Sequence, residues 1–176
     1  MLDELLERNQ IYAERHRDGL PSLPRRSLVV LTCMDHRIDP AAALGLELGD
    51  AMVIRNAGGR ATSSFIQNLA MAGLVARTRG AEPSSFELVL MQHTECGVGG
   101  LTDEHSDALA TYFEVSPDQL DSLAPADPHE GVRVDIETLA SNPAVPAALS
   151  VTGLVFDVAT GQVELVERRA PLRDGD

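Results

Sequence analysis

Two cysteines and one histidine stand just after two short apolar runs of the sequence. Cys33 follows the run at residues 28–31, and His93 and Cys96 follow the run at residues 88–91. Runs of this length and composition are typical of buried strands. Thiolates and imidazoles are zinc ligands, and three of them leave a fourth position open for chemistry, whereas purely structural zinc sites fill all four positions with protein. The three side chains therefore predict a catalytic zinc site at two neighbouring strand ends.

A carboxylate and a guanidinium lie beside the first of these ligands. Asp35 and Arg37 alternate with Cys33, so all three side chains would point the same way in an extended segment. An ordinary ion pair is one interpretation. Because perturbed ionisable groups concentrate at functional sites, we favour a functional pair beside the metal. Asp35 can then accept a hydrogen bond from a water on the zinc, or bind the metal itself and block it.

A polar and glycine-rich turn at residues 55–59 ends a third expected strand. The turn lacks the spacing of a dinucleotide-binding fingerprint, and it has no Gly-Lys-Ser/Thr phosphate loop. Two interpretations stay open for it. It is a tight turn that needs positive φ, or it is a wall of the active site built close to the backbone.

Strands that alternate with helices predict an α/β fold with a mostly parallel central sheet, flanking helices and an antiparallel hairpin at its C-terminal edge. Ligands of such sheets bind outside the carboxyl ends of the strands. Thr62 and Thr102 are expected to cap helices. The expected strands cover residues 28–31, 51–55, 86–92, 151–158 and 163–166, and the expected helices cover residues 2–17, 41–46, 63–79, 102–113 and 129–141.

The same pattern suggests how the chain is divided. We expect an N-terminal helical arm at residues 1–24, a zinc-binding α/β domain at 25–167 and a frayed tail at 168–176. The proline-rich, acidic residues 114–128 are expected to form a surface excursion.

Composition limits the class of partner. The 176 residues are 44% hydrophobic and fit one domain, and the net charge of −13 disfavours nucleic acid and anionic membranes as partners. No apolar run approaches the roughly 20 residues that span a bilayer, and the charged N-terminus does not read as a secretory signal. We therefore expect a cytoplasmic protein, in which the two cysteines stay reduced.

Two expected helices lack a partner within the chain. The helix at 2–17 is amphipathic, with leucines and Tyr12 between charges, and nothing local covers its apolar face. The helix at 63–79 is apolar on more than one face. Both features predict a second subunit.

Three motifs together resemble the beta-class carbonic anhydrases. They are Cys-x-Asp-x-Arg at 33–37, Arg-Asn-Ala-Gly at 55–58 and His-x-x-Cys-Gly at 93–97, and the similarity extends to the hairpin at 153–166. The resemblance implies an enzyme of the zinc lyase type, a carbonate dehydratase, in which hydroxide on the zinc reversibly hydrates carbon dioxide to bicarbonate and a proton. It implies zinc on Cys33, His93 and Cys96, with Asp35 and Arg37 as the catalytic pair.

The resemblance also implies a substrate pocket and an assembly. Residues at the pocket would be Arg55, Asn56, Ala57, Gly58 and Gly97. The chain would form a homodimer or a dimer of dimers, with the N-terminal arm lying over the partner.

Two departures from the family pattern leave alternatives open. His36 stands where a small residue is usual, and it would act as a proton carrier or as a hydrogen-bonding group near the metal ligands. The glycine-rich segment after Gly97 leaves the pocket shape open, so hydrolysis of carbonyl sulfide or carbon disulfide is an alternative activity. A non-catalytic zinc protein that mediates interactions or senses bicarbonate is a further alternative, against which Asp35 and Arg37 argue.

Overall fold

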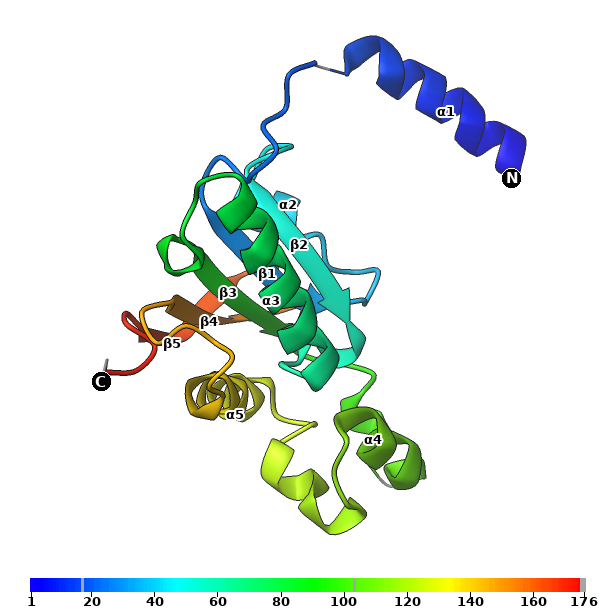
Figure 1. Ribbon diagram of the computed structural model, residues 1–176. Coiled ribbons are helices and arrows are strands. Elements are labelled where there is room, and N and C mark those ends of the chain that lie inside the picture. The colour runs from blue at the N-terminus through cyan, green and yellow to red at the C-terminus, as the bar shows by residue number, and fades with distance from the viewer. Residues whose placement is uncertain (17, 103, 175–176) are drawn as a thin grey trace.

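The computed structural model describes residues 1–16, 18–102 and 104–174, which include one five-stranded sheet of order β2-β1-β3-β4-β5 (Figure 1). Strands β1 to β4 are parallel, and β5 pairs antiparallel with β4 through a bulge at Gly153 and Leu154. The expected α/β fold, with a mostly parallel sheet and an antiparallel edge hairpin, is confirmed. The strands are β1 (Leu28–Cys33), β2 (Ala51–Asn56), β3 (Glu87–His93), β4 (Ser150–Phe156) and β5 (Val163–Arg169).

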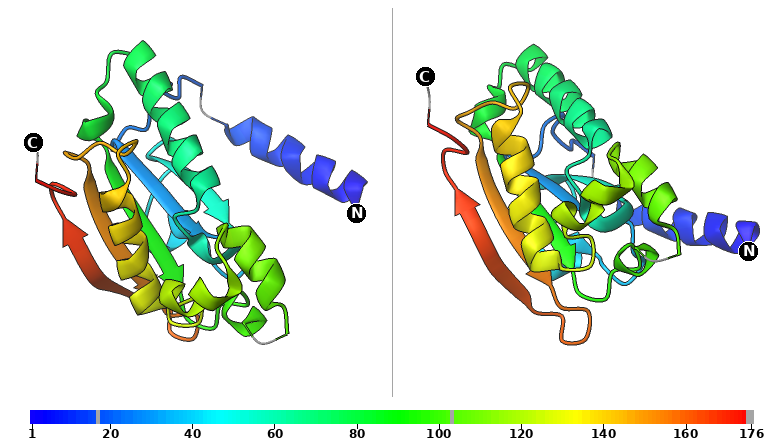
Figure 2. Two further views of the ribbon diagram at one scale, coloured as in Figure 1. Left: turned by 60° about the horizontal axis from the view of Figure 1, so that its bottom comes forward. Right: turned by 90° about the horizontal axis from the view of Figure 1, so that it is seen from below.

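Helices cover both faces of the central strands. The longer helices α3 and α5 lie on one face, as both views of Figure 2 show, and bury Phe65, Val132 and Ile136 against the sheet. The short helix α2 lies on the other face, where Leu44 packs on a second cluster. Burial on both faces explains why the central strands are continuous apolar runs. The α-helices are α1 (Leu2–Arg15), α2 (Pro40–Leu44), α3 (Ser63–Thr78), α4 (Ser106–Phe113) and α5 (Pro128–Ser141).

Two α-helices begin at the capping residue that the sequence indicated. Thr62 caps α3 as expected, and Asp39 accepts two backbone N–H groups at the start of α2. Among the described residues, none of the helices is both long and apolar enough to cross a bilayer.

The segment after β3 differs from the expectation in two places. Thr102 does not cap a helix, because Gly99–Leu101 form a 3-10 turn and α4 begins only at Ser106, after the N-cap His105. The Thr102 hydroxyl instead donates to the Gly99 carbonyl. Residues 114–128 are more than a surface excursion, since they contain a 3-10 helix, Pro117–Leu123, that buries Leu120 beside α4.

The C-terminal tail is also more ordered than expected. Strand β5 continues to Arg169, so the prediction of a frayed tail from residue 168 was wrong for its first part. Leu172 is 2% exposed, and its N–H donates to the Leu149 carbonyl. The Arg173 guanidinium donates to the carbonyls of Ala140, Asn142 and Val145, two of which lie at the end of α5. Residues that were expected to fray therefore complete an edge strand and bind carbonyls at the end of α5.

Helix α1 extends away from the sheet, and none of its residues is buried (Figure 1). Its Leu2 is 68% exposed. Helix α3 buries only Phe65 and Ala76, while its Met71 is 60% exposed. The expectation that this helix is buried on both sides is thus not met within one chain.

Gly153 in β4 supplies a test of how tightly α5 packs on the sheet. A side chain here would overlap Val132 and lie 3.0 Å from Ile136. We expect Gly153→Ala to lower the free energy of unfolding by about 1–3 kcal/mol through overpacking. Urea denaturation measures the loss, and Gly100→Ala is the control because nothing lies within 4 Å of the added methyl. Equal stability of the two variants would contradict this packing.

Candidate metal centre

Three potential metal ligands converge at the carboxyl ends of β1 and β3. The ligand atoms of Cys33, His93 and Cys96 all lie within 4.8 Å of one another. The two Sγ atoms are 3.9 Å apart, and both cysteines are free. Two thiolates on a tetrahedral zinc, with Zn–S bonds of about 2.3 Å, would stand roughly 3.8 Å apart. The sulfur spacing therefore fits zinc.

His93 presents one free ring nitrogen to the two sulfurs. Its Nδ1 lies 2.8 Å from the Thr94 carbonyl, which can only accept, so Nδ1 carries the proton. Its Nε2 is the one buried side-chain nitrogen or oxygen of the described residues that has no hydrogen-bond partner. Buried polar atoms are rarely left unpaired, and a metal-binding histidine usually donates its other nitrogen to a carbonyl or carboxylate. The imidazole thus has the orientation of a metal ligand.

The two thiols titrate as a pair. A hydrogen bond from Cys96 is the main cause that lowers the pKa of Cys33 to about 4; burial opposes this shift, and backbone N–H groups add to it. The same interaction with Cys33 raises the pKa of Cys96, and burial raises it further. In the absence of a cation, the pair therefore keeps one proton at neutral pH. A divalent cation would displace that proton, as metal binding to thiols generally does.

Asp35 and Arg37 form a bidentate ion pair beside the cluster. Arg37 Nε lies 3.0 Å from Asp35 Oδ1, and Nη2 lies 2.8 Å from Oδ2. The Arg37 side chain is the main cause that lowers the pKa of Asp35 below its ordinary value. Because that pKa is depressed in the folded state, the stabilisation is present above the ordinary pKa and is lost only as the pH falls through the lowered value. Asp35 is therefore ionised at neutral pH.

Arg37 also joins the two loops that carry the ligands. Its Nη2 donates to the Glu95 carbonyl at 2.9 Å, and its Nη1 lies 3.3 Å from the Glu95 carboxylate. Glu95 has a positive φ of 55°, which is uncommon for a side chain of this type. The guanidinium thus contacts the residue between His93 and Cys96 while it holds Asp35.

The glycine-rich turn lies directly behind Cys33. Gly58 and Gly59 have φ of 80° and 66°, and a side chain on Gly59 would lie 2.8 Å from the Cys33 nitrogen. Two hydrogen bonds of the Asn56 side chain close the turn. Its amide oxygen accepts from the Arg60 backbone N–H, and its amide nitrogen donates to the Arg60 carbonyl. The turn therefore needs positive φ, as one interpretation of the sequence held.

Arg55 braces the loop that carries the ligand Cys33. Its guanidinium lies 3.2 Å from the Cys33 carbonyl and 2.8 Å from the Ile38 carbonyl. His36, by contrast, has a 94% exposed side chain, and its Nδ1 is 3.9 Å from Asp35 Oδ1. His36 was expected either to carry protons or to form a hydrogen bond near the metal ligands. At 3.9 Å it forms no hydrogen bond with Asp35.

A small pocket adjoins the centre. Of the five residues expected at a substrate pocket, Gly58 lines it. Arg55 and Asn56 make the backbone contacts described above, and the Ala57 carbonyl accepts from Tyr112. Gly97 lies in the turn after Cys96, with open space where a side chain would be. The pocket is lined by Gly58, Arg60, Gln92, His93, Cys96, Val98, Pro125, Ala126 and Pro128.

Sequence reasoning missed a buried polar cluster next to this pocket, made of Arg60, Gln92 and Asp135. Arg60 and Asp135 are 3% and 4% exposed, and burial raises the pKa of Asp135 while Arg60 opposes the shift. A signal was present, because Asp135 falls among Val132 and Ile136 on the apolar face of its helix. A charge at such a position is normally paired when buried.

Comparison with known proteins agrees with this arrangement. The sequence profile of the family described as "Carbonic anhydrase" matches residues 28–116. "Beta-carbonic anhydrase 1" of Mycobacterium tuberculosis is 34% identical over 165 residues, which cover 93% of this chain and 96% of that protein. "Carbon disulfide hydrolase" of Acidianus sp. is 32% identical over 186 residues, covering 90% and 85%.

A solved structure extends the likeness to the whole fold. The crystal structure of carbonic anhydrase from Streptococcus mutans superposes with a TM-score of 0.75 at 35% identity, covering 94% of this chain and 97% of that one. The family that the three motifs indicated is thereby confirmed. This chain belongs to the beta-carbonic anhydrase family.

Proposed function

We propose that this protein is a zinc enzyme that reversibly hydrates carbon dioxide to bicarbonate and a proton. The observation that carries the proposal is the unpartnered Nε2 of buried His93, which lies within 4.8 Å of the Cys33 and Cys96 sulfurs. Family membership supports it. Zinc would be held by these three residues, and it supplies the Lewis acidity that lets a water attack carbon dioxide at neutral pH.

Asp35 and Arg37 orient the attacking water in this proposal. The ionised Asp35 carboxylate accepts a hydrogen bond from the water and points its lone pair at the carbon of carbon dioxide. Arg37 fixes the carboxylate through two parallel N–H···O bonds and so keeps it from approaching the sulfurs and His93. The exposed His36 next to Asp35 is suited to pass the released proton to solvent.

Hydrolysis of carbon disulfide or carbonyl sulfide is the second candidate, favoured by the 32% identity to a carbon disulfide hydrolase. These molecules are linear isosteres of carbon dioxide and would use the same residues. Stopped-flow measurement of proton release with carbon dioxide, beside sulfide release from the two sulfur compounds, decides between the activities. No turnover of any of the three would favour a non-catalytic zinc protein instead.

The metal assignment predicts about one zinc per chain in the purified protein. Cys33→Ser and Cys96→Ser should each lose most of it, because a serine hydroxyl does not ionise near neutral pH and binds zinc weakly. Elemental analysis by mass spectrometry measures the content. His129→Ala is the control, since this histidine lies at the start of α5. Full zinc content in both serine variants would refute the ligand set.

The Asp35 and Arg37 assignment predicts a split between metal content and turnover. Asp35→Asn should keep zinc and lose about 100-fold or more in kcat, because a neutral amide accepts a weaker hydrogen bond from the water than an ionised carboxylate does. Arg37→Ala should also be impaired at neutral pH, since Asp35 is then free to bind the metal. Arg133→Ala, which removes an exposed ion pair with Glu130, serves as the control.

The pH dependence of kcat follows from the same pair. Asp35 stays ionised over the neutral and alkaline range because its pKa is lowered, so a rise in activity with pH would come from a group other than this carboxylate, such as a water that a bound metal would acidify. We expect such a rise in the wild type and a partial recovery of Arg37→Ala at high pH. A flat profile, with Arg37→Ala fully active at neutral pH, would reduce the pair to an ordinary ion pair.

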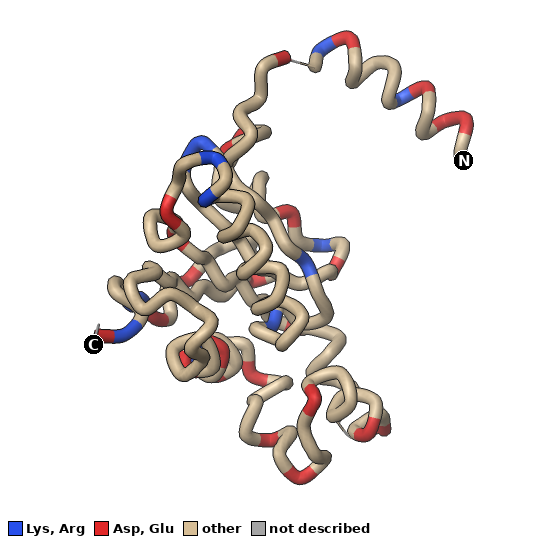
Figure 3. The backbone as a smooth tube through the Cα atoms, in the orientation of Figure 1, with Lys and Arg blue, Asp and Glu red and all other residues tan. Residues whose placement is uncertain are grey.

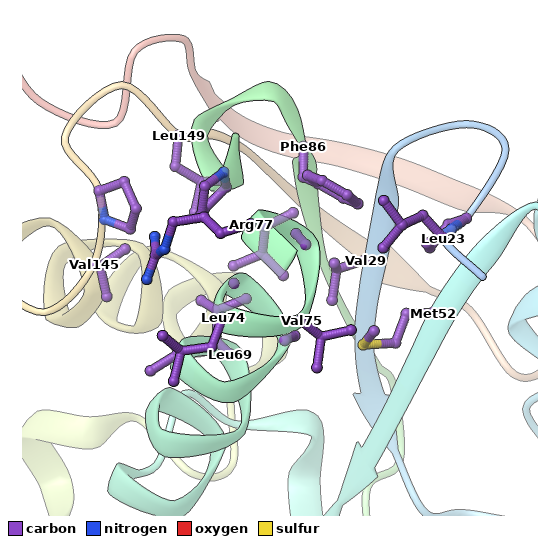
Figure 4. A pocket seen from close by; sticks show the side chains of 18 of the residues that line it. Leu23, Val29, Met52, Leu69, Leu74, Val75, Arg77, Phe86, Val145 and Leu149 are labelled. Carbon is purple, nitrogen blue, oxygen red and sulfur yellow. The ribbon is translucent and has the colours of Figure 1, made fainter. Parts of the chain in front are cut away.

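Assembly into a homodimer or a dimer of dimers completes the proposal. Helix α3 carries no charged residue from Ser63 to Ala76 (Figure 3). Its residues Leu69 and Val75, together with Leu149 before β4, line an apolar pocket of about 260 Å³ (Figure 4). None of the other described residues buries the exposed leucines of α1. Monomers rarely leave large apolar patches uncovered.

Light scattering tests the assembly. We expect a dimer or a larger even oligomer at micromolar concentration. The double variant Leu5→Glu/Leu6→Glu should weaken it, because charges would enter the apolar contact. The matched control is Glu4→Gln/Arg8→Gln, which changes an exposed ion pair on the same helix. A monodisperse wild-type monomer would contradict the proposed assembly.

A further inference from the structure

A buried ion pair with a third polar partner lies next to the metal centre. Arg60 Nε donates to Asp135 Oδ2 at 2.9 Å, and Gln92 Nε2 donates to the same oxygen at 2.9 Å. A second Arg60 nitrogen donates to the Leu123 carbonyl at 2.7 Å, and the guanidinium carbon lies 5.2 Å from the centre of the Phe113 ring. All polar groups of the Arg60 and Asp135 side chains are thus shielded from solvent.

Two members of this network, Arg60 and Gln92, lie next to the segments that carry the metal ligands. The Asn56 side-chain amide donates to the Arg60 carbonyl. Arg60 directly follows Gly59, whose backbone packs closely against the backbone of Cys33. Gln92 directly precedes His93 in β3. The network therefore ties the strand ends that carry Cys33 and His93 to the single carboxylate of Asp135 on α5.

The cost of burial argues that the network serves more than stability. Removing two charges from water is unfavourable, and well-packed apolar residues are often as stable as a buried ion pair. The fold also makes room for the network, because a side chain on Gly131 of α5 would lie 2.6 Å from the side-chain amide oxygen (Oε1) of Gln92. What an apolar cluster would not supply is directional bonds that fix the two strand ends relative to each other.

We propose that Arg60, Gln92 and Asp135 are positioning residues that hold the two ligand-bearing strand ends at the separation zinc requires. The proposal rests on the zinc site proposed above. None of the three touches substrate. Their contribution is a slower loss of zinc from the folded protein, because the ligands cannot drift apart while the network is intact.

Zinc retention, measured beside unfolding, separates this role from general stability. Zinc-loaded protein is mixed with excess chelator, and release is followed by colour change, while urea unfolding is recorded with zinc present in excess. The variants are Asp135→Asn and Gln92→Leu. The control is Leu139→Ala, a fully buried residue of the apolar cluster one turn further along α5 that forms no hydrogen bond of the polar network.

We expect Asp135→Asn and Gln92→Leu to release zinc about tenfold faster than wild type. Leu139→Ala should release it at the wild-type rate although it unfolds at lower urea. Gln92→Leu removes one hydrogen bond and keeps the ion pair, so it carries the test should Asp135→Asn not fold.

Two results would overturn the positioning role. The first is that Gln92→Leu and Asp135→Asn release zinc at the wild-type rate. The second is that the zinc release rate of every variant, Leu139→Ala included, follows its urea unfolding midpoint. A wild type that holds no zinc would overturn the proposed function as well. If the wild type holds zinc and the variants release it at the wild-type rate, only the positioning role is overturned.

Discussion

The parallel register of β1 and β3 is the constraint on which the metal centre depends. Thr32 in β1 stands opposite Met91 in β3, so Cys33 and His93 emerge at the same edge of the sheet. Neither strand end supplies three ligands by itself, and 60 residues separate them in the chain. Because both strands are buried on both faces, a one-residue slip would move apolar side chains out of two clusters at once. Core packing thereby fixes the spacing of the ligands.

Backbone contacts then hold the loops at that edge. The Gly58–Gly59 turn approaches Cys33 closely enough to exclude any side chain, and Arg55 binds the carbonyls of the loop that follows Cys33. Arg37 connects this loop to the Glu95 carbonyl next to Cys96. These donors are arginines, whose planar guanidinium can bind several acceptors in fixed directions. Arginine hydrogen bonds therefore connect the segments that carry the metal ligands to one another and to the strand ends.

Electrostatics at the centre follow from the same contacts. Arg37 keeps Asp35 ionised, while the two sulfurs share one proton until a cation displaces it. The guanidinium fixes the position of the Asp35 carboxylate and balances its charge beside the two sulfurs.

Much of this protein could be read from the sequence, because its main signals are local. Apolar runs predicted the central strands, and residue type and spacing predicted Cys33, His93, Cys96 and the Asp35 and Arg37 pair. The start of α4 was misplaced because Gly99–Leu101 fold into a 3-10 turn, and the tail was underestimated because its partners, such as Leu149, are distant in the chain. The network of Arg60, Gln92 and Asp135 was missed for the same reason: its members are up to 75 residues apart, and no local pattern pairs them. The sequence by itself thus determined which side chains meet at the candidate metal centre, since residue type and strand periodicity are short-range properties. Only the tertiary structure decided which buried groups contact the segments that carry these side chains, since such contacts depend on how segments far apart in the chain pack together.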